Sequence, residues 1–202
     1  LYTAGEINRI GSIAEGNTVS DYSPNEIEKQ ISISTSLMHL EWNNSKINIL
    51  DTPGYTDFIG DVKCAMRISD MAVMVLKSAE GVEVGSENTG RFVNEFGLPS
   101  SIIINKVDNE HSKFKETELQ AKDRLSAGAI IVTFPVNEGI NFDTVVDVLK
   151  MKAYKYDVIG TKKVTEIEIP SELKSDAEVY RTELIEKVAE TTEELMNKYF
   201  ED

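Results

Sequence analysis

The residues best suited to bind a ligand lie in two short motifs, each directly after a run of apolar residues. The first motif is Asp51-Thr52-Pro53-Gly54, and the second is Asn105-Lys106-Val107-Asp108. The apolar runs, 47–50 and 101–104, predict buried strands. Both motifs therefore start at the carboxyl ends of strands, where α/β proteins bind their ligands.

The second motif predicts a loop that recognises guanine. The Asp108 carboxylate can accept hydrogen bonds from two guanine donors at once, and adenine does not offer that pair of donors. Lys106 can lay its aliphatic stem along the base while its charge stays in water. The Asn105 amide can tie the loop to neighbouring backbone.

The first motif predicts a segment that senses a terminal phosphate. Asp51 can hold Mg²⁺ through water, and Gly54 lets its backbone N–H approach a phosphate oxygen. Gain or loss of that phosphate would then move the segment after Gly54. Asp-Thr-Pro-Gly is also an ordinary turn, in which Pro fixes φ and Gly supplies a positive φ. The order of the motifs and their spacing of 54 positions favour the nucleotide interpretation.

A third part of a GTP site is absent from the 202 residues. No Gly-x-x-x-x-Gly-Lys-Ser/Thr loop occurs, although this loop supplies the backbone amides, the Lys and the Mg²⁺-binding hydroxyl that hold the phosphates. We therefore expect the chain to be part of a longer protein, to lack the first strand of its sheet and to be inactive by itself.

The apolar patterns predict an α/β fold whose character changes near residue 130. In the first part, strands are expected at 31–42, 46–50, 71–76 and 101–104, and helices at 62–68, at 86–96 and from a cap at Ser112 to 124. In the second part, strands are expected at 130–136, 153–156 and 164–169, and helices at 142–150 and from a capping box at 175–178 to about 200. Apolar residues on the last helix favour a core stripe over a groove for a partner: Leu184, Val188, Leu195 and Tyr199.

From Leu1 to about residue 156, the chain resembles the GTPase domain of bacterial translation elongation factor G, starting just after the phosphate loop. The matching stretches are 1–11, 21–34, 47–54, Asp57-Phe58, Gly81-Val82 and 146–154. The last of these separates the family from ribosome-protection proteins and class-3 release factors. Residues 166–200 continue in the pattern of that factor's insert subdomain. The resemblance implies a partial GTPase domain at 1–129, with a mostly parallel P-loop GTPase-type sheet and flanking helices, and an α+β insert subdomain at 130–202.

Two positions depart from the family pattern. Where the family has Arg-Gly-Ile-Thr-Ile in its first switch, this chain has Ser32 in place of the Thr, and a Ser hydroxyl can still ligate Mg²⁺. Where the family has a catalytic His after Asp-Thr-Pro-Gly, this chain has Tyr55. A phenol can donate a hydrogen bond but does not change charge near neutral pH as a histidine does. Hydrolysis is therefore expected to be slower, differently triggered or lost, which suggests a paralogue of the housekeeping factor.

The resemblance implies a cytoplasmic translational GTPase that uses GTP and Mg²⁺ to move tRNA and mRNA through the ribosome, with ribosomal RNA and the stalk protein as partners. Two alternatives stay open. One is a GTP-sensing, ribosome-binding paralogue that does not hydrolyse GTP, and the other is a ribosome-protection protein.

Composition fits this expectation. The formal charge of −14 and the lack of a long basic cluster argue against broad nonspecific binding to nucleic acid, DNA included. A single cysteine, Cys64, excludes a disulfide framework. No apolar run reaches transmembrane length, so no membrane partner is expected.

Overall fold

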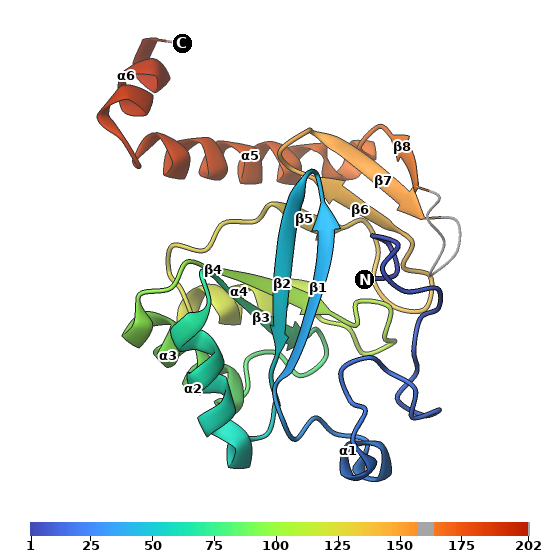
Figure 1. Ribbon diagram of the computed structural model, residues 1–202. Coiled ribbons are helices and arrows are strands. Elements are labelled where there is room, and N and C mark those ends of the chain that lie inside the picture. The colour runs from blue at the N-terminus through green and yellow to red at the C-terminus, as the bar shows by residue number, and fades with distance from the viewer. Residues whose placement is uncertain (157–163, 202) are drawn as a thin grey trace. The chain divides into compact units, whose positions relative to one another are not determined.

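The computed structural model describes residues 1–156 and 164–201. The chain forms two compact units, the first of residues 1–75 and 83–103, and the second of residues 76–82 and 104–202. The division runs through strands β3 (Ala72–Lys77) and β4 (Ser100–Asn105), which form a two-stranded sheet (Figure 1). The family-based boundary between residues 129 and 130 stays a prediction.

Strands β3 and β4 run in the same direction. Ala72 N–H donates to Pro99 C=O (2.9 Å) where both strands begin, and Ser78 N–H donates to Asn105 C=O (2.9 Å) where both end. Both strands lie within about one residue of the predicted ranges 71–76 and 101–104. They are the parallel part of the predicted α/β fold.

The first unit begins with helix α1 (Pro24–Lys29) and a hairpin of strands β1 (Ser36–Trp42) and β2 (Ser45–Asp51). The hairpin turn consists of Asn43 and Asn44, whose φ angles of 48° and 60° are the positive values that a two-residue turn of this kind requires. The predicted hairpin is confirmed, but β1 starts five residues later than predicted. The amides of Ile33 and Ser34 donate to a side chain of α1 instead of to a strand.

That side chain is Glu26, which is 3% exposed. Its carboxylate and the Ser23 hydroxyl form a capping box at the start of α1. The same carboxylate accepts hydrogen bonds from Ile33 N–H (3.0 Å) and Ser34 N–H (3.1 Å). These backbone donors, with Ile33 foremost, outweigh the effect of burial and lower the pKa of Glu26 from 4.5 to about 2. Glu26 therefore holds the segment between α1 and β1.

Two helices cover the apolar core of the first unit. The 3-10 helix η1 (Thr56–Phe58) leads into α2 (Ile59–Ile68), and α3 (Val84–Phe96) ends at Gly97, whose φ of 63° suits glycine. The core consists of Val62, Met66, Ala72, Met74, Phe92 and Val93. Lys63 Nζ lies 4.2 Å from the centre of the Phe92 ring, so its stem joins α2 to α3. The predicted helices at 62–68 and 86–96 are confirmed.

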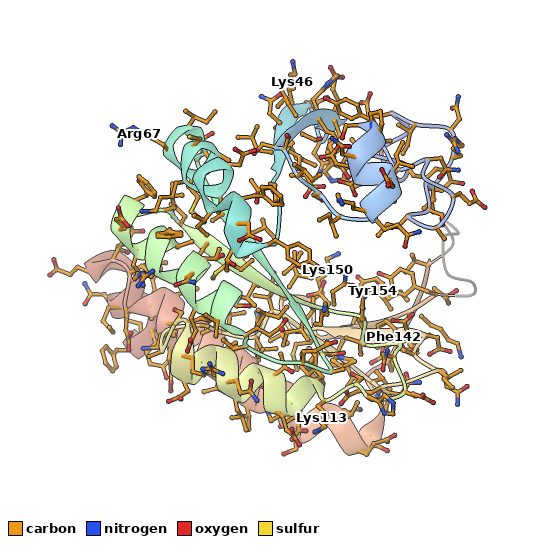
Figure 2. All side chains as sticks on the ribbon, turned by 90° about the horizontal axis from the view of Figure 1, so that it is seen from below. Lys46, Arg67, Lys113, Phe142, Lys150 and Tyr154 are labelled. Atoms are coloured by element: carbon orange, nitrogen blue, oxygen red, sulfur yellow. The ribbon has the colours of Figure 1, made fainter. Side chains whose placement is uncertain are left out.

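The second unit contains a four-stranded antiparallel sheet in the order β5-β6-β7-β8. Its strands are β5 (Thr133–Pro135), β6 (Thr144–Asp147), β7 (Lys152–Tyr156) and β8 (Val164–Ile167). On its surface, Lys150 Nζ lies 5.2 Å from the centre of the Tyr154 ring (Figure 2). The 3-10 helix η2 (Ser171–Leu173) and helix α5 (Lys174–Ala189) follow.

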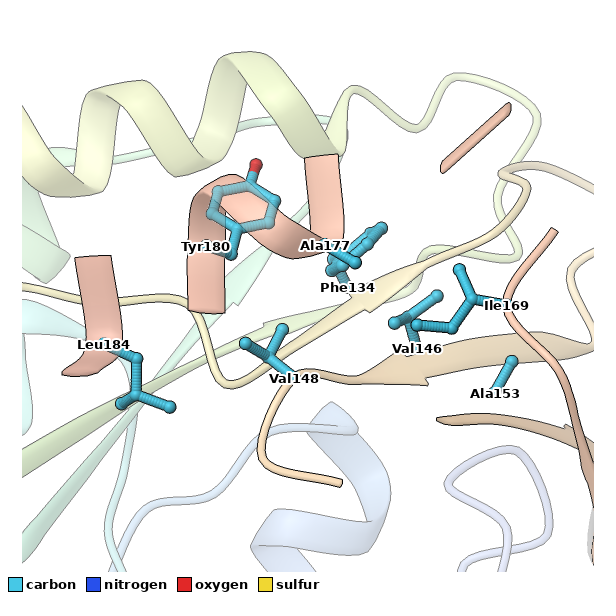
Figure 3. Close-up of a cluster of buried hydrophobic side chains, with 8 residues drawn as sticks. All are labelled: Phe134, Val146, Val148, Ala153, Ile169, Ala177, Tyr180 and Leu184. Carbon is cyan, nitrogen blue, oxygen red and sulfur yellow. The ribbon is translucent and has the colours of Figure 1, made fainter. Parts of the chain in front are cut away.

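Helix α5 packs on this sheet. The shared core consists of Phe134, Val146, Val148, Ala153, Ile169, Ala177, Tyr180 and Leu184 (Figure 3). The rings of Phe134 and Tyr180 have centroids 5.2 Å apart. A helix over an antiparallel sheet is the α+β arrangement expected for this part of the chain.

The predicted helix at 142–150 is wrong, because residues 144–147 form strand β6. Thr144, Val145 and Val146 are β-branched and favour a strand, and burial alternates along β6 as a strand requires. The predicted strand at 130–136 is reduced to Thr133–Pro135.

The predicted final helix is two helices, α5 and α6 (Glu193–Glu201). Helix α5 begins at Lys174 after η2, so the predicted capping box at Ser175 is wrong. The break follows from Thr192, whose hydroxyl accepts a hydrogen bond from Leu195 N–H (3.2 Å) at the start of α6. Of the predicted core stripe, Leu184 is buried, whereas Val188 is 45% exposed and Tyr199 is 39% exposed.

Helix α5 also contacts helix α4 (Phe114–Arg124) through buried polar groups. Glu118 is 3% exposed, and its carboxylate accepts hydrogen bonds from the Tyr180 hydroxyl (2.8 Å) and Lys115 Nζ (2.8 Å). Burial and the bond to Glu118 raise the pKa of Tyr180. Lys122 Nζ reaches Glu183 on α5 at 3.0 Å. This network fixes α4, the helix that follows the second motif.

None of the helices in the described ranges is both long enough and apolar enough to cross a bilayer.

Candidate functional site

The first motif starts on the last residue of β2. Asp51 pairs with Ser36 of β1, which fixes its position at the end of the hairpin. Asp51 and Thr52 are half-buried, Pro53 is buried and Gly54 is exposed. Among the described residues, the Asp51 carboxylate has no hydrogen-bonding partner, so it is available to a water-bound cation.

Gly54 is not the turn glycine that an ordinary Asp-Thr-Pro-Gly turn needs, because its φ is not positive. A Cβ placed on Gly54 would meet no described atom within 4 Å. Packing therefore does not explain a glycine here, and the backbone at Gly54 is open to the approach of a ligand. This geometry fits the predicted contact between Gly54 N–H and a phosphate.

Tyr55 follows the motif at the start of η1. Its carbonyl accepts a hydrogen bond from Phe58 N–H (3.1 Å), and its side chain is 58% exposed. The phenol is therefore free to meet a ligand or a partner surface.

Ser32 lies half-buried in the segment that Glu26 holds. A second carboxylate ties this segment to α2, since Thr35 N–H donates to Asp61 Oδ2 at 3.0 Å. Asp61 lies in the first turn of α2, the helix that follows the first motif. The segment carrying Ser32 and the segment after Gly54 are thus linked directly within the first unit. Sequence reasoning missed Glu26 and Asp61, although Ser23-x-x-Glu26 is a recognisable capping-box pattern.

The second motif begins on the last residue of β4 and turns sharply at Lys106. Lys106 has a φ of 58°, in the left-handed region that costs a non-glycine residue about 1 to 2 kcal/mol. Its carbonyl accepts hydrogen bonds from the Ser78 hydroxyl (2.8 Å) and from Asn109 N–H (3.1 Å). Ser78 is fully buried at the end of β3. These bonds hold the loop in its turned conformation.

The polar side chains of the second motif take no part in this internal support. Asn105, Lys106 and Asp108 are exposed, and within residues 1–156 and 164–201 their side chains have no hydrogen-bonding partner. Val107, in contrast, is 7% exposed. A loop anchored by its backbone and Val107 thus leaves its polar side chains available to a ligand.

Three further residues support the loop, and sequence reasoning missed all of them. Thr117 of α4 donates its hydroxyl hydrogen to Ser78 C=O (3.0 Å), Gly139 N–H donates to Val107 C=O (2.8 Å), and Glu138 caps α4. The predicted cap at Ser112 is wrong, because its hydroxyl instead donates to Glu138, which also accepts Phe114 N–H. No sequence signal marks these partners, which lie 24 to 39 positions apart.

The first motif and Ser32 belong to the first unit, and the second motif belongs to the second unit. Each unit thus carries one group of candidate residues. The residues that would hold Mg²⁺ are Ser32 and Asp51, both oxygen ligands of the kind that Mg²⁺ prefers.

Comparisons with known proteins identify the family of this chain. Residues 1–199 match the family described as the elongation factor Tu GTP binding domain. The crystal structure of ttk003000868 from Thermus thermophilus is similar to this chain, with a TM-score of 0.91 and 28% sequence identity. The match covers 99% of this chain and 30% of that chain. The predicted α/β GTPase-type fold is confirmed, and the chain belongs to the elongation factor Tu GTP binding domain family of translational GTPases.

Proposed function

We propose that the complete protein is a translational GTPase of the elongation factor G type, which hydrolyses GTP with Mg²⁺ to move tRNA and mRNA on the ribosome. The observation that carries the proposal is the second motif, a loop fixed by Ser78 and Gly139 whose Asp108 carboxylate is exposed and unpaired within the described residues. Family membership supports a translational GTPase. The stretch at 146–154, which resembles elongation factor G, supports the finer assignment.

In this proposal, guanine is recognised by the second motif. Asp108 accepts hydrogen bonds from two guanine donors, the Lys106 stem lies along the base, and the Asn105 amide steadies the loop. Because Val107 is buried and its carbonyl is bonded to Gly139, the motif does not need to reorganise when the base binds. A preformed loop favours guanine binding, because the loop loses little conformational entropy on binding and the hydrogen bonds to the base are therefore not offset.

The first motif takes the phosphate side. Asp51 would hold Mg²⁺ through water, the Ser32 hydroxyl would be a ligand of the ion, and Gly54 N–H would donate to the terminal phosphate. Thr52 and Pro53 would set the backbone path between Asp51 and Gly54. Bound Mg²⁺ neutralises the charge that develops on the phosphates. Since Asp61 bonds Thr35, movement after Gly54 is transmitted to the segment that carries Ser32.

Tyr55 occupies the position at which the attacking water is oriented. Its exposed hydroxyl can donate or accept a hydrogen bond to that water. The partners of the complete protein are the ribosome, its stalk protein and ribosomal RNA, in the cytoplasm, with residues 1–129 as a partial GTPase domain and 130–202 as the insert subdomain. The 202 residues contain no phosphate-binding loop of the usual pattern, and so are inactive alone in this proposal.

The second candidate function is a GTP-sensing, ribosome-binding paralogue that does not hydrolyse GTP. The observation that favours it is Tyr55 at the catalytic position. A ribosome-protection protein is a third candidate. The stretch at 146–154 counts against it, because ribosome-protection proteins differ from elongation factor G in that stretch.

Release of phosphate from GTP by the complete protein, with and without ribosomes, tests the proposal. We expect ribosomes to stimulate release. Binding of GTP and ribosomes without stimulated release would favour the non-hydrolysing paralogue, and failure to bind GTP would contradict both.

A further inference from the structure

A loop distant in sequence from the second motif supports it from outside. This loop, residues 136–143, joins β5 to β6 and is closed by its own bond from Phe142 N–H to Gly139 C=O (2.9 Å). Gly139 has a φ of 83° and donates its N–H to Val107 C=O at 2.8 Å. The residue before it, Glu138, turns its carboxylate to the start of α4.

Glu138 provides a cap that α4 lacks locally. Phe114, the first residue of α4, donates its N–H to Glu138 Oε2 at 2.8 Å, and the Ser112 hydroxyl donates to the same oxygen at 2.5 Å. The N-cap residue itself is Lys113, whose side chain offers no acceptor (Figure 2). A carboxylate at this end also complements the helix dipole.

The backbone hydrogen bonds in the segment between Asp108 and α4 connect this cap to the loop that would recognise guanine. Asn109 N–H donates to Lys106 C=O (3.1 Å), and Ser112 N–H donates to Asn109 C=O (2.9 Å). The short segment 109–113 is therefore a chain of turns. The Ser78 hydroxyl fixes one end, and Glu138 fixes the other together with the bond from Lys113 N–H to Ser78 C=O (3.0 Å). Release of either end would let Asp108 shift relative to the base.

We propose that Glu138 is a positioning residue for guanine recognition, which holds the Asp108 loop by capping α4 and fixing Ser112. This inference rests on the proposed function, because it assumes that Asp108 pairs with guanine. It goes beyond that function by assigning part of the base specificity to the β5–β6 loop.

Amide hydrogen exchange of the chain without nucleotide tests the anchor itself. The variant is Glu138→Ala, which removes the acceptor oxygens, and the matched control is Glu110→Ala, which removes a carboxylate from an exposed residue of the segment. We expect amides in 109–117 to exchange about tenfold faster in Glu138→Ala and at the wild-type rate in Glu110→Ala, since tenfold corresponds to about 1.4 kcal/mol, near the lower end for a hydrogen bond to a charged group. Equal protection in all three proteins would overturn the proposal.

Ser78→Ala probes the loop from its other end. It removes the hydroxyl that donates to Lys106 C=O and keeps the backbone N–H that bonds Asn105. We expect faster exchange at Asn109, whose acceptor is the Lys106 carbonyl. Exchange at Asn109 that stays as slow as in the wild type would contradict the two-ended support.

The guanine role is tested by the affinities of the complete protein for GTP and ITP, which lacks the 2-amino donor. A positioning role predicts that Glu138→Ala lowers GTP affinity more than ITP affinity, so that their ratio falls severalfold, while Glu110→Ala keeps the ratio. An equal loss of affinity for GTP and ITP would show that Glu138 only caps α4, and would overturn the proposal. A wild-type protein that binds neither nucleotide would instead contradict the proposed function, and the exchange data would still decide whether Glu138 holds the loop.

Discussion

Lys106 shows how a single residue prepares the second motif for a ligand. Its left-handed backbone is unfavourable by about 1 to 2 kcal/mol, yet its carbonyl accepts hydrogen bonds from Ser78 and Asn109, each of which contributes about 1 kcal/mol net. The turned conformation is therefore sustained by its surroundings. The side chains of Asn105 and Asp108 can then face a base without ordering the loop first.

Tyr55 gives the sharpest prediction at this scale. We expect Tyr55→His to accelerate ribosome-stimulated GTP hydrolysis by roughly a hundredfold, because an imidazole can orient the attacking water as the family histidine does, and one lost orienting group costs about 2.7 kcal/mol or more. Single-turnover hydrolysis on ribosomes measures this rate.

The control is Tyr199→His on α6, a partly exposed tyrosine outside both motifs, for which no change is expected. A wild-type rate equal to or above that of Tyr55→His would show that the phenol is the effective group in this protein.

At the scale of elements, one buried carboxylate organises the path from α1 to β1. Glu26 closes the capping box of α1 and accepts the amides of Ile33 and Ser34. This explains why β1 begins only at Ser36, although the apolar alternation starts earlier. The neighbouring bond from Thr35 to Asp61 then joins this path to α2. Together they define a linked pair of segments around Ser32 and Gly54.

We predict that Glu26→Gln lowers the free energy of unfolding of the first unit by roughly 2 kcal/mol at pH 7, because hydrogen bonds to a charged group contribute about 1.5 to 3 kcal/mol. The folded-state pKa of Glu26 is about 2, below its ordinary value of 4.5. Its stabilising contribution is therefore complete above pH 4.5 and is lost as pH falls toward 2.

Urea unfolding followed by the fluorescence of Trp42, the single tryptophan, measures this difference. Glu28→Gln, an exposed change on the same helix, should leave the free energy nearly unchanged. If the difference in the free energy of unfolding between wild type and Glu26→Gln stays constant from pH 7 to pH 2, the charge of the carboxylate is not the cause of the stabilisation.

For the whole molecule, the sequence was most informative where chemistry and local pattern coincide. The apolar runs at 47–50 and 101–104 end at the predicted motifs, so β2 and β4 were predicted together with the candidate residues that follow them. Residues 144–147 were assigned to a helix because a short apolar run does not distinguish a buried strand from a helix. The α5–α6 break was missed because a threonine cap at Thr192 is compatible with a continuous helix pattern.

The supports of the site could not be predicted for a different reason. Ser78 and Lys106 are 28 positions apart, and Glu138 and Phe114 are 24 apart. Their contacts depend on how strands and helices meet in three dimensions. A serine or a glutamate in the sequence does not by itself indicate such a supporting role. Sequence thus predicts the groups that would contact a ligand and leaves their anchors to the structure.

The central claim is that the second motif reads guanine. Competition binding of GTP, ATP and XTP to the complete protein and to Asp108→Asn tests it most directly, with Asp123→Asn, an exposed aspartate on α4, as the control. Two hydrogen bonds to a carboxylate contribute about 3 to 6 kcal/mol, so the wild-type protein and the control should prefer GTP over ATP by roughly two to four orders of magnitude. Asp108→Asn should shift the preference to XTP, whose extra carbonyl suits an amide donor. Equal affinities of the wild-type protein for GTP and ATP would contradict the account.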